Sequence, residues 1–306
     1  MIPLAEIRRA RERLGGTVLR TPVVQVGENV WAKLENLQPI GSFKLRSALN
    51  AIRAASADEL AAGVVTVSAG NMAQGVAWAA REAGIRARII VPDTAPHAKL
   101  DAIERLGGEV LAVPRGEWWQ TMLDGRAEGI DGLFVHPVLN DAVMAGNGTI
   151  GLELCEDLDG FDTVIAPWGG GGLTTGVASA VKALRPDVRI VTAEPANGAP
   201  FAAAFAAGGP VEIEFEPSFV DGAGGPCLLP TMWERAYELV DEAVAVPLED
   251  VAGAIRTLAS HARVVAEGAG ALALAAAQGR EGRTVCIVSG GNIDAAVLAR
   301  ILAGGS

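Results

Sequence analysis

Short runs of β-branched residues alternate along this chain with longer alanine-rich segments that have helical spacing. The first such runs lie at residues 64–67 and 88–91, and helical segments follow them at 73–83 and 98–106. Apolar spacing near 3.6 residues predicts helices, and short β-branched runs predict strands. Because parallel strands need crossover connections, this alternation predicts an α/β fold of open sheets with helices on both faces.

The alternation falls into two series, which predict two domains. The strand candidates are residues 64–67, 88–91, 110–113 and 133–136 in the first series, and 163–166, 189–192, 243–246 and 285–288 in the second. We expect residues 55–140 to form a small inserted domain around the first series. Residues 1–54 and 141–306 are expected to form a large domain, whose sheet also takes in residues 30–34.

The composition excludes several classes of protein. Half of the 306 residues are hydrophobic, which is enough for a large core, and the net charge of -11 opposes nucleic-acid binding, which needs a basic face. The N-terminus lacks the features of a signal peptide, and the apolar stretch 266–277 is shorter than the roughly 20 residues that cross a bilayer. We therefore expect a cytoplasmic protein with a small-molecule partner and neither a nucleic-acid nor a membrane partner.

The cysteines and histidines give no support for a metal site or a disulfide framework. Each type occurs three times, and no pair has the short spacing typical of transition-metal ligands. We interpret them as reduced thiols and ordinary structural residues: Cys155, Cys227, Cys286, His97, His136 and His261. The stretch 198–216, which is rich in alanine and then in glutamate, predicts a helix followed by a loop and an exposed strand.

Four consecutive glycines follow one of the strand candidates. Residues 163–166 lead into Gly169, Gly170, Gly171 and Gly172, and residues 173–184 then have helical spacing. Unpaired N–H groups and the helix dipole converge on an anion at such a strand-to-helix junction, where absent side chains let the backbone approach a phosphate. A flexible glycine linker is the alternative. The patterns of nucleoside triphosphate and dinucleotide loops are absent.

Lys44 begins a helical segment after Ser42, which is a plausible N-cap. Apolar residues follow at positions 45, 48, 49 and 52, so the amine is expected near a helix N-terminus. A lone lysine is usually a solvated charge, and only its context can favour a role as a nucleophile that forms a Schiff base.

That context is a set of five motifs in a fixed order. They are Gly41-Ser42-Phe43-Lys44-Leu45-Arg46, Ser68-Ala69-Gly70-Asn71-Met72-Ala73-Gln74-Gly75, Pro167-Trp168-Gly169-Gly170-Gly171-Gly172-Leu173, Glu194-Pro195 and Ser289-Gly290-Gly291-Asn292. In order and spacing this set resembles the threonine/serine dehydratase and serine racemase family from about residue 17 to 300. The resemblance implies pyridoxal 5'-phosphate as cofactor and the two-lobed fold type II of tryptophan synthase β subunits, with the large domain holding the cofactor.

The resemblance also implies a role for each matching residue. Lys44 would form the Schiff base with the cofactor, Asn71 would contact the phenolic oxygen of its ring, and Ser289 would bind the pyridine nitrogen. The phosphate would lie on Gly169, Gly170, Gly171, Gly172 and Leu173. Phe43 and Glu267 match family positions beside the cofactor, although a solvated or helix-capping role for Glu267 stays open.

The substrate carboxylate would be bound by backbone N–H groups at a helix start, in the turn formed by Ser68, Ala69, Gly70, Asn71 and Met72. Taken singly, Asn71 could simply cap a helix and Ser289 could belong to a strand-ending turn. The neutral hydroxyl of Ser289 would not keep the pyridine nitrogen protonated, which suits elimination better than transamination.

The implied activity is that of an ammonia-lyase. A β-hydroxy amino acid, L-threonine or L-serine, would lose water and be released as 2-oxobutyrate or pyruvate plus ammonia. Racemases of this group resemble Ser-Ser-Gly-Asn at the turn where this chain has Ala69, so we expect dehydration without efficient racemisation. Hydroxyaspartate or phenylserine dehydration, serine racemisation, β-replacement and a catalytically silent cofactor-binding protein are the alternatives.

Several positions depart from the family pattern. Met72 stands where histidine is usual, Ser47 replaces a glycine, and Trp168 would narrow the cleft or stack on an aromatic substrate if it faced the cleft, although a packed core position is commoner. Metal-activated members have a second carboxylate six residues after Glu194, where this chain has Pro200. We therefore expect no metal site. A homodimer is expected from the family.

Overall fold

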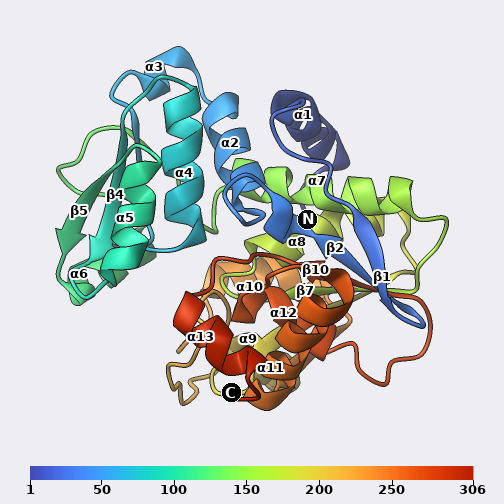
Figure 1. The fold of residues 1–306 in the computed structure, drawn as a ribbon. Helices are drawn as coiled ribbons and strands as arrows, with labels where there is room; N and C mark the ends of the chain where they lie inside the picture. Colours follow the sequence, from blue (N-terminus) through green and yellow to red (C-terminus); the bar gives the residue numbers. More distant parts are fainter. Residues whose placement is uncertain (306) are drawn as a thin grey trace.

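The computed structural model describes residues 1–305, which form two open sheets with helices packed around them (Figure 1). The larger sheet has six strands in the order β1-β2-β10-β7-β8-β9, and the smaller has four in the order β5-β4-β3-β6. The smaller sheet and its helices lie on one side of the molecule, and α2 and α7 lie between them and the larger sheet (Figure 1). The predicted α/β class is confirmed.

The larger sheet is parallel except at one edge. Strand β1 pairs antiparallel with β2, and all the other neighbours pair parallel, with Cys286 of β10 opposite both Ala32 and Ile165. Its strands are β1 (Val23–Gly27), β2 (Val30–Leu34), β7 (Thr163–Pro167), β8 (Arg189–Pro195), β9 (Glu242–Val246) and β10 (Thr284–Val288). The predicted strands, including the one at 30–34, are therefore present, and β1 is an addition to them.

The smaller sheet is parallel throughout. Its strands are β3 (Val64–Val67), β4 (Ala87–Pro92), β5 (Gly108–Val113) and β6 (Leu133–Phe134), and the expected run at 133–136 is shortened to two residues. Parallel strands with both faces covered are apolar on both sides, as β3 is at all four positions.

Helices cover both faces of each sheet. In the larger sheet Val285 and Ile287 of β10 face one core cluster, and Cys286 and Val288 face another. This alternation follows from the two-residue period of a strand. The helices are α1 (Leu4–Leu14), α2 (Lys44–Ala54), α3 (Ala57–Leu60), α4 (Asn71–Glu82), α5 (His97–Arg105), α6 (Arg115–Asp124), α7 (Asp141–Asp157), α8 (Gly172–Leu184), α9 (Pro200–Ala207), α10 (Pro230–Ala236), α11 (Leu248–Thr257), α12 (Gly268–Ala275) and α13 (Ala295–Leu302).

Short helical turns complete the chain at η1 (Glu35–Leu37), η2 (Tyr237–Leu239) and η3 (Leu258–Ala262). Among residues 1–305, no helix has both the length and the apolar character needed to cross a membrane.

Two local predictions were wrong. Ser42 does not cap α2: its hydroxyl has no hydrogen-bond partner, and the residue instead forms an isolated antiparallel bridge with Gly290. The helix then begins at Lys44 without a side-chain cap. The exposed strand expected near Glu212–Glu216 is absent, because residues 210–216 form irregular structure after α9. A strand pattern without a neighbouring strand to pair with does not give a strand.

Candidate functional site

A cavity of about 640 Å³ lies where the two sheets face each other. The loops that follow β3, β7 and β10 all contribute to its wall, so it sits at the carboxyl ends of parallel strands, the usual ligand position in open α/β sheets. Every residue that the sequence indicated for the site lines this cavity: Phe43, Lys44, Ser68, Ala69, Gly70, Asn71, Met72, Gly169, Gly170, Gly171, Gly172, Leu173, Glu267 and Ser289.

Four helices begin at this cavity. The first residues of α2, α4 and α8 are Lys44, Asn71 and Gly172, and Glu267 is the N-cap position of α12; all four line the wall. The N-terminus of a helix carries a partial positive charge and unpaired N–H groups. Their convergence makes the cavity a site for an anionic ligand with more than one negative group.

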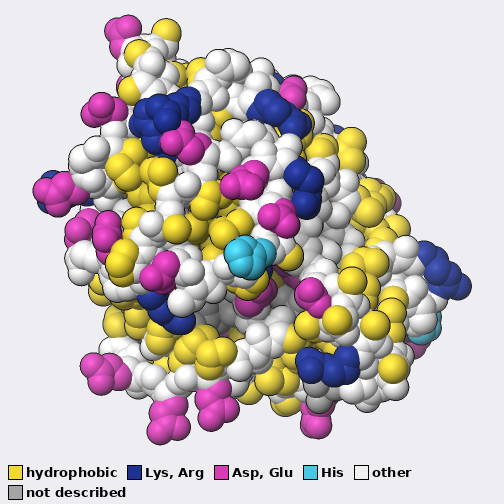
Figure 2. Space-filling model, turned by 60° about the vertical axis from the view of Figure 1, so that its left-hand side comes forward, with side chains coloured by type: hydrophobic (Ala, Val, Ile, Leu, Met, Phe, Trp, Pro, Cys, Tyr) yellow, Lys and Arg dark blue, Asp and Glu magenta, His cyan; other side chains and the backbone are white. Residues whose placement is uncertain are grey.

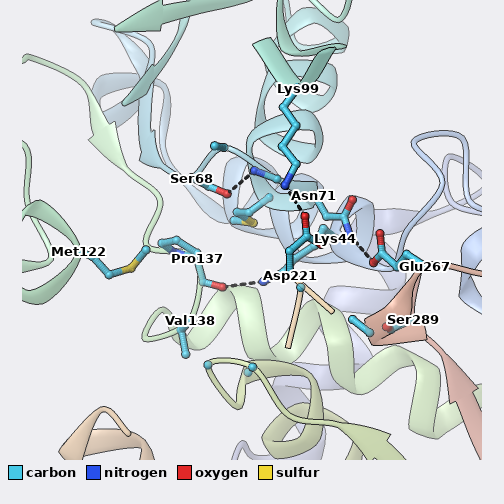
Figure 3. A pocket seen from close by; sticks show the side chains of 18 of the residues that line it. Lys44, Ser68, Asn71, Lys99, Met122, Pro137, Val138, Asp221, Glu267 and Ser289 are labelled. Atoms are coloured by element: carbon cyan, nitrogen blue, oxygen red, sulfur yellow. Dashed lines mark hydrogen bonds and ion pairs between the residues drawn. The ribbon is translucent and has the colours of Figure 1, made fainter. Parts of the chain in front are cut away.

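Lys44 points its amine into this space. Its Nζ donates to the carbonyl oxygen of Pro137 at 2.9 Å (Figure 3), and the Phe43 ring centroid lies 5.2 Å away. No acidic side chain pairs with Lys44 among the described residues. Burial therefore lowers the pKa of Lys44 from 10.5 to about 8, because the charged form loses water without gaining a counter-ion. A lysine in this state is a competent nucleophile at mildly alkaline pH.

The glycines are required by the backbone path between β7 and α8. Gly171 is the N-cap of α8 with φ +90°, and a Cβ at that position would meet the Trp168 ring. A Cβ at Gly170 would meet the Val138 side chain. The first turn of α8 carries no acidic residue, so no carboxylate there would repel an anion bound to its N–H groups. The loop is thus a cradle of backbone groups rather than a linker.

Asn71 connects two sides of the cavity. Its Nδ2 donates to Glu267 Oε1 at 2.7 Å, and its Oδ1 accepts from Asn292 Nδ2 at 2.7 Å (Figure 3 shows the first contact). Burial raises the pKa of Glu267 to about 7, with the nearby Asp221 charge acting in the same direction. Glu267 is therefore a carboxyl that changes charge near neutral pH. Asn71 does not cap α4, whose N-cap is Gly70.

Ser289 lies at the end of β10 and is tied to the start of α2. Its carbonyl oxygen accepts from the backbone N–H of Phe43 at 3.0 Å, and the Ser42–Gly290 bridge lies beside this contact. The Ser289 side chain is almost fully buried and borders the cavity. Residues 42–43 and residues 289–290, about 250 positions apart in sequence, are thus held next to each other, and Lys44 follows Phe43 directly.

Sequence reasoning missed several residues of the wall. Lys99 Nζ and Asp221 Oδ2 are 2.5 Å apart and join α5 to the loop before α10 across the cavity (Figure 3). Arg115, Trp118 and Met122 of α6 also line it. No spacing or composition signal marks these residues, since their proximity depends on the packing of the two sheets. On the face drawn in Figure 2, basic and acidic side chains are interspersed rather than gathered into a patch of one sign.

Trp168 and Met72 have different positions relative to the cavity. Trp168 is fully buried and stacks on Phe201, with ring centroids 3.9 Å apart, so it packs in the core instead of narrowing the cleft. Met72 is 2% exposed and lines the cavity as an apolar residue in the first turn of α4. His136 is structural, since its Nδ1 accepts from the backbone of Val138 and Leu139.

The carboxylate of Glu194 is hydrogen-bonded to the start of a helix. Its two carboxylate oxygens accept from the backbone N–H groups of Phe201 and Ala202, at 3.1 and 2.7 Å, in the first turn of α9. Burial raises the pKa of Glu194 to about 7. Within residues 1–305 no group of three or more histidine, cysteine or acidic side chains is arranged to hold a metal ion.

The arrangement matches a known family. The family model described as "Pyridoxal-phosphate dependent enzyme" matches residues 14–290, which is most of the chain and spans every loop of the cavity. The chain belongs to this family of pyridoxal phosphate-dependent enzymes. The resemblance stated from the motifs is confirmed, and so is the cofactor that it implied.

Curated relatives within the family cover nearly the whole chain. An L-threonine ammonia-lyase from Thermotoga maritima is 39% identical over 99% of this chain and 78% of its own length. A catabolic L-threonine dehydratase from Staphylococcus aureus is 36% identical over 96% of this chain and 90% of its own length. These relatives are lyases, in agreement with the enzyme class predicted from the sequence.

Solved structures of family members have the same fold. Maize serine racemase superimposes with a TM-score of 0.88 at 33% identity, over 97% of this chain and 95% of the racemase. The processed form of threonine deaminase isoform 2 from Solanum lycopersicum gives a TM-score of 0.86 at 31% identity, over 98% of this chain and 92% of the deaminase. The predicted fold type is confirmed.

The residues of the cavity fit pyridoxal phosphate. The group needs a primary amine for covalent attachment, donors for a phosphate and polar partners for a ring. The cavity offers the unpaired amine of Lys44, the N–H groups at the start of α8, and the side chains of Asn71 and Ser289. Its volume of about 640 Å³ lies in the usual range for a pocket that takes a small molecule.

Proposed function

We propose that this family member dehydrates and deaminates a β-hydroxy amino acid, with L-threonine or L-serine as substrate and 2-oxobutyrate or pyruvate plus ammonia as products. The observation that carries the proposal is the Lys44 amine, which lies at the convergence of four helix N-termini with its pKa lowered to about 8. The two relatives that act on threonine, at 36 and 39% identity, support the choice of reaction.

The proposed roles divide the cavity into a cofactor side and a substrate side. Backbone groups from Gly169 to Leu173 would hold the phosphate, Ser289 would bind the ring nitrogen, and Asn71 would contact the phenolic oxygen, with Glu267 beside it. When bound, pyridoxal phosphate draws electrons away from the α-carbon of an attached amino acid. The turn from Ser68 to Met72 binds the substrate carboxylate through N–H groups at the start of α4.

Lys44 is the proposed proton carrier. The neutral Nζ of Lys44, when free, would take the α-proton of the substrate, and its pKa of about 8 in the cofactor-free protein leaves a large neutral fraction near pH 8. The Pro137 carbonyl oxygen, 2.9 Å from Nζ, orients the amine. In the net reaction the α-proton and the β-hydroxyl would leave together as water, and the released enamine would then take up water to give the 2-oxo acid and ammonia.

Ala69 supports elimination over racemisation. It lines the cavity beside Ser68, and its methyl group cannot accept or donate a proton. The Ser68 hydroxyl accepts from the backbone N–H of Gly70 at 3.2 Å, which engages it within the turn. Formation of D-serine from L-serine at a rate near that of pyruvate would contradict this reading.

The test combines spectroscopy with a product assay. Purified wild type and Lys44→Ala are each loaded with pyridoxal phosphate, and the visible band is recorded. L-threonine, L-serine and L-threo-phenylserine are then added, while 2-oxo acid and ammonia are measured. We expect a band and 2-oxo acid formation in the wild type and the loss of both in Lys44→Ala. Lys182→Ala is the matched control, since Lys182 pairs with Asp241 away from the cavity.

Other outcomes would point elsewhere. A band without a 2-oxo acid product, followed by a new amino acid when a thiol is supplied, would replace dehydration with β-replacement. A band without any product would indicate a silent cofactor-binding protein. Equal bands in wild type and Lys44→Ala would overturn the role of Lys44. The homodimer, the cytoplasmic location and the two-domain boundaries stay predictions.

A further inference from the structure

A buried cluster of four charged residues lies behind the start of α2. It consists of Lys33 on β2, Glu35 in η1, Arg46 on α2 and Glu153 on α7, whose side chains are between 0 and 8% exposed. Two cations face two carboxylates within the cluster, and the more exposed Asp157 lies at its edge, 3.5 Å from Lys33 Nζ. None of the four residues lines the cavity that holds Lys44. The proposed reaction therefore leaves this cluster without a function.

Arg46 is the centre of the cluster. Its guanidinium donates two hydrogen bonds to Glu35, at 2.8 and 2.9 Å, and two to Glu153, at 2.6 and 2.9 Å. Further bonds reach Thr149 Oγ1 at 3.1 Å and the carbonyl oxygen of Leu19 at 3.0 Å. Paired forks of this kind fix the orientation of a guanidinium, and a lysine cannot reproduce them. Arg46 thereby connects the start of α2 both to η1 and to α7.

Arg46 stands two residues after Lys44, in the same first turn of α2. At about 100° per residue their side chains leave the helix roughly 200° apart, so one enters the cavity and the other enters the cluster. The turn lacks a capping side chain, since the Ser42 hydroxyl has no partner. A helix end without a cap frays readily unless tertiary contacts hold it.

Two other helices pack closely against the backbone of this turn. A Cβ at Gly75 of α4 would lie 2.9 Å from the carbonyl oxygen of Lys44, and a Cβ at Gly146 of α7 would meet the carbonyl oxygen of Arg46. Helices α4 and α7 therefore approach the first turn of α2 at backbone contact. Among the side chains of the turn, the Ser47 hydroxyl donates to Asn147 Oδ1 of α7 at 2.5 Å, and Arg46 alone makes ionic contacts behind the helix.

We propose that Arg46 is a positioning residue: it anchors the first turn of α2 from behind and so holds the Lys44 amine in the cavity. A buried ionic cluster is by itself weak support for stability, because the cost of desolvation offsets the attraction. The cluster acts on Lys44 through position, since burial alone accounts for the lowered pKa of that amine and none of the four charges contributes to it. The inference rests on the proposed role of Lys44.

Arg46→Lys is the decisive variant, because it keeps the charge of the cluster and removes the paired forks. We expect amide hydrogen exchange in the first turn of α2 of the cofactor-free protein to become at least tenfold faster, with exchange in the second half of the helix little changed. The Kd for pyridoxal phosphate should rise about tenfold. In the loaded enzyme kcat should fall about tenfold while KM changes less than threefold, since the substrate turn lies on α4.

Lys33→Met is the matched control. It removes a charge from the same cluster, with the loss of contacts to Glu153 Oε2 at 2.6 Å, to the carbonyl oxygen of Thr21 at 2.7 Å and to Asp157 Oδ2 at 3.5 Å. None of the hydrogen bonds of Arg46 involves Lys33. We expect Lys33→Met to lower the Tm at least as much as Arg46→Lys, with unchanged exchange in the first turn and an unchanged Kd. Equal effects of the two variants on Kd, or wild-type values in Arg46→Lys, would overturn the proposal.

A milder variant covers the case in which Arg46→Lys does not fold. Thr149→Val removes one acceptor from the guanidinium and keeps all four charges; a two- to threefold rise in Kd with faster exchange at the start of α2 supports the proposal, and wild-type values refute it. The role of Lys44 is decided separately by the visible band of Lys44→Ala. If that band persisted, the proposed function would fail even where Arg46 still controlled exchange in the turn.

Discussion

Asn71 Nδ2 donates to Glu267 Oε1 at 2.7 Å, which links the first residue of α4 to the residue before α12 across the cavity. The contact is compatible with both charge states of the carboxyl, since Oε1 can accept in either. Glu267 is 5% exposed, and burial disfavours its charged form more than the bond from Asn71 favours it. The pair thus places a carboxyl that titrates near pH 7 beside the proposed cofactor.

The stability of the cofactor-free protein should depend on this carboxyl. The pKa of Glu267 is raised from 4.5 to about 7 on folding, so its contribution is fully present below about pH 4.5 and is lost as the pH rises through 7. Glu267→Gln keeps an acceptor for Asn71 and cannot ionise. We expect its Tm to exceed that of the wild type by an amount that grows between pH 5 and pH 8, as measured by thermal unfolding. The exposed Glu12→Gln is the control, and a difference that is independent of pH would contradict the prediction.

Burial of Lys44 should also lower the stability of the cofactor-free protein, but its effect should disappear with rising pH, whereas the effect of Glu267 should grow. Its pKa is lowered on folding, so burial of the ammonium destabilises the cofactor-free protein below pH 8, and the penalty disappears as the pH rises towards 10.5. Lys44→Met is expected to be more stable than the wild type at pH 7, by on the order of 1 to 2 kcal/mol. Urea denaturation at pH 7 and pH 10 measures the gap, which should shrink at the higher pH. A destabilised Lys44→Met at pH 7 would show that the amine is not desolvated.

The strands could be predicted from the sequence because their signal is local. Val64–Val67 and Thr284–Val288 are buried at every position, and continuous apolar runs of that length between helical segments indicate parallel strands. Gly169 to Gly172 could be placed for the same reason, since a strand, four glycines and a helix follow one another directly. The motif order then identified the family.

The remaining features depend on contacts between distant residues. Ser42 has the residue type of an N-cap, but its backbone bridges to Gly290, 248 positions later, and Phe43 occupies the cap position instead. Lys99 and Asp221 meet only because the two sheets face each other, and nothing in their spacing indicates it. Glu212 to Glu216 alternate like a strand but find no neighbour to pair with. Long-range packing decided each of these cases.

Turnover should not depend on a divalent cation supplied through Glu194. Both of its carboxylate oxygens accept from backbone N–H groups at the start of α9, which leaves a poor donor set for a hard cation. Incubation with a chelator followed by desalting is expected to change the rate of 2-oxo acid formation less than twofold. In Glu194→Gln one acceptor oxygen becomes an amide donor, so the free energy of unfolding should fall by about 1 to 3 kcal/mol. A large loss of rate with chelator would show that a cation is bound.

The substitution Gly171→Ala tests whether the glycine loop between β7 and α8 binds the phosphate. Gly171 has φ +90°, and the Cβ of Gly171→Ala would meet the Trp168 ring, which is fully buried against Phe201 and cannot retreat. The start of α8 should then shift, and we expect the Kd for pyridoxal phosphate to rise at least tenfold in a titration of the visible band. Gly208→Ala is the matched control, because Gly208 at the end of α9 has φ +77° and no atom within 4 Å of an added Cβ. That variant should lose only about 1 kcal/mol of stability, from the left-handed backbone, and bind the cofactor like the wild type. If both variants bound equally well, the glycine loop would not be the phosphate site, since a displaced helix start could not leave the affinity unchanged.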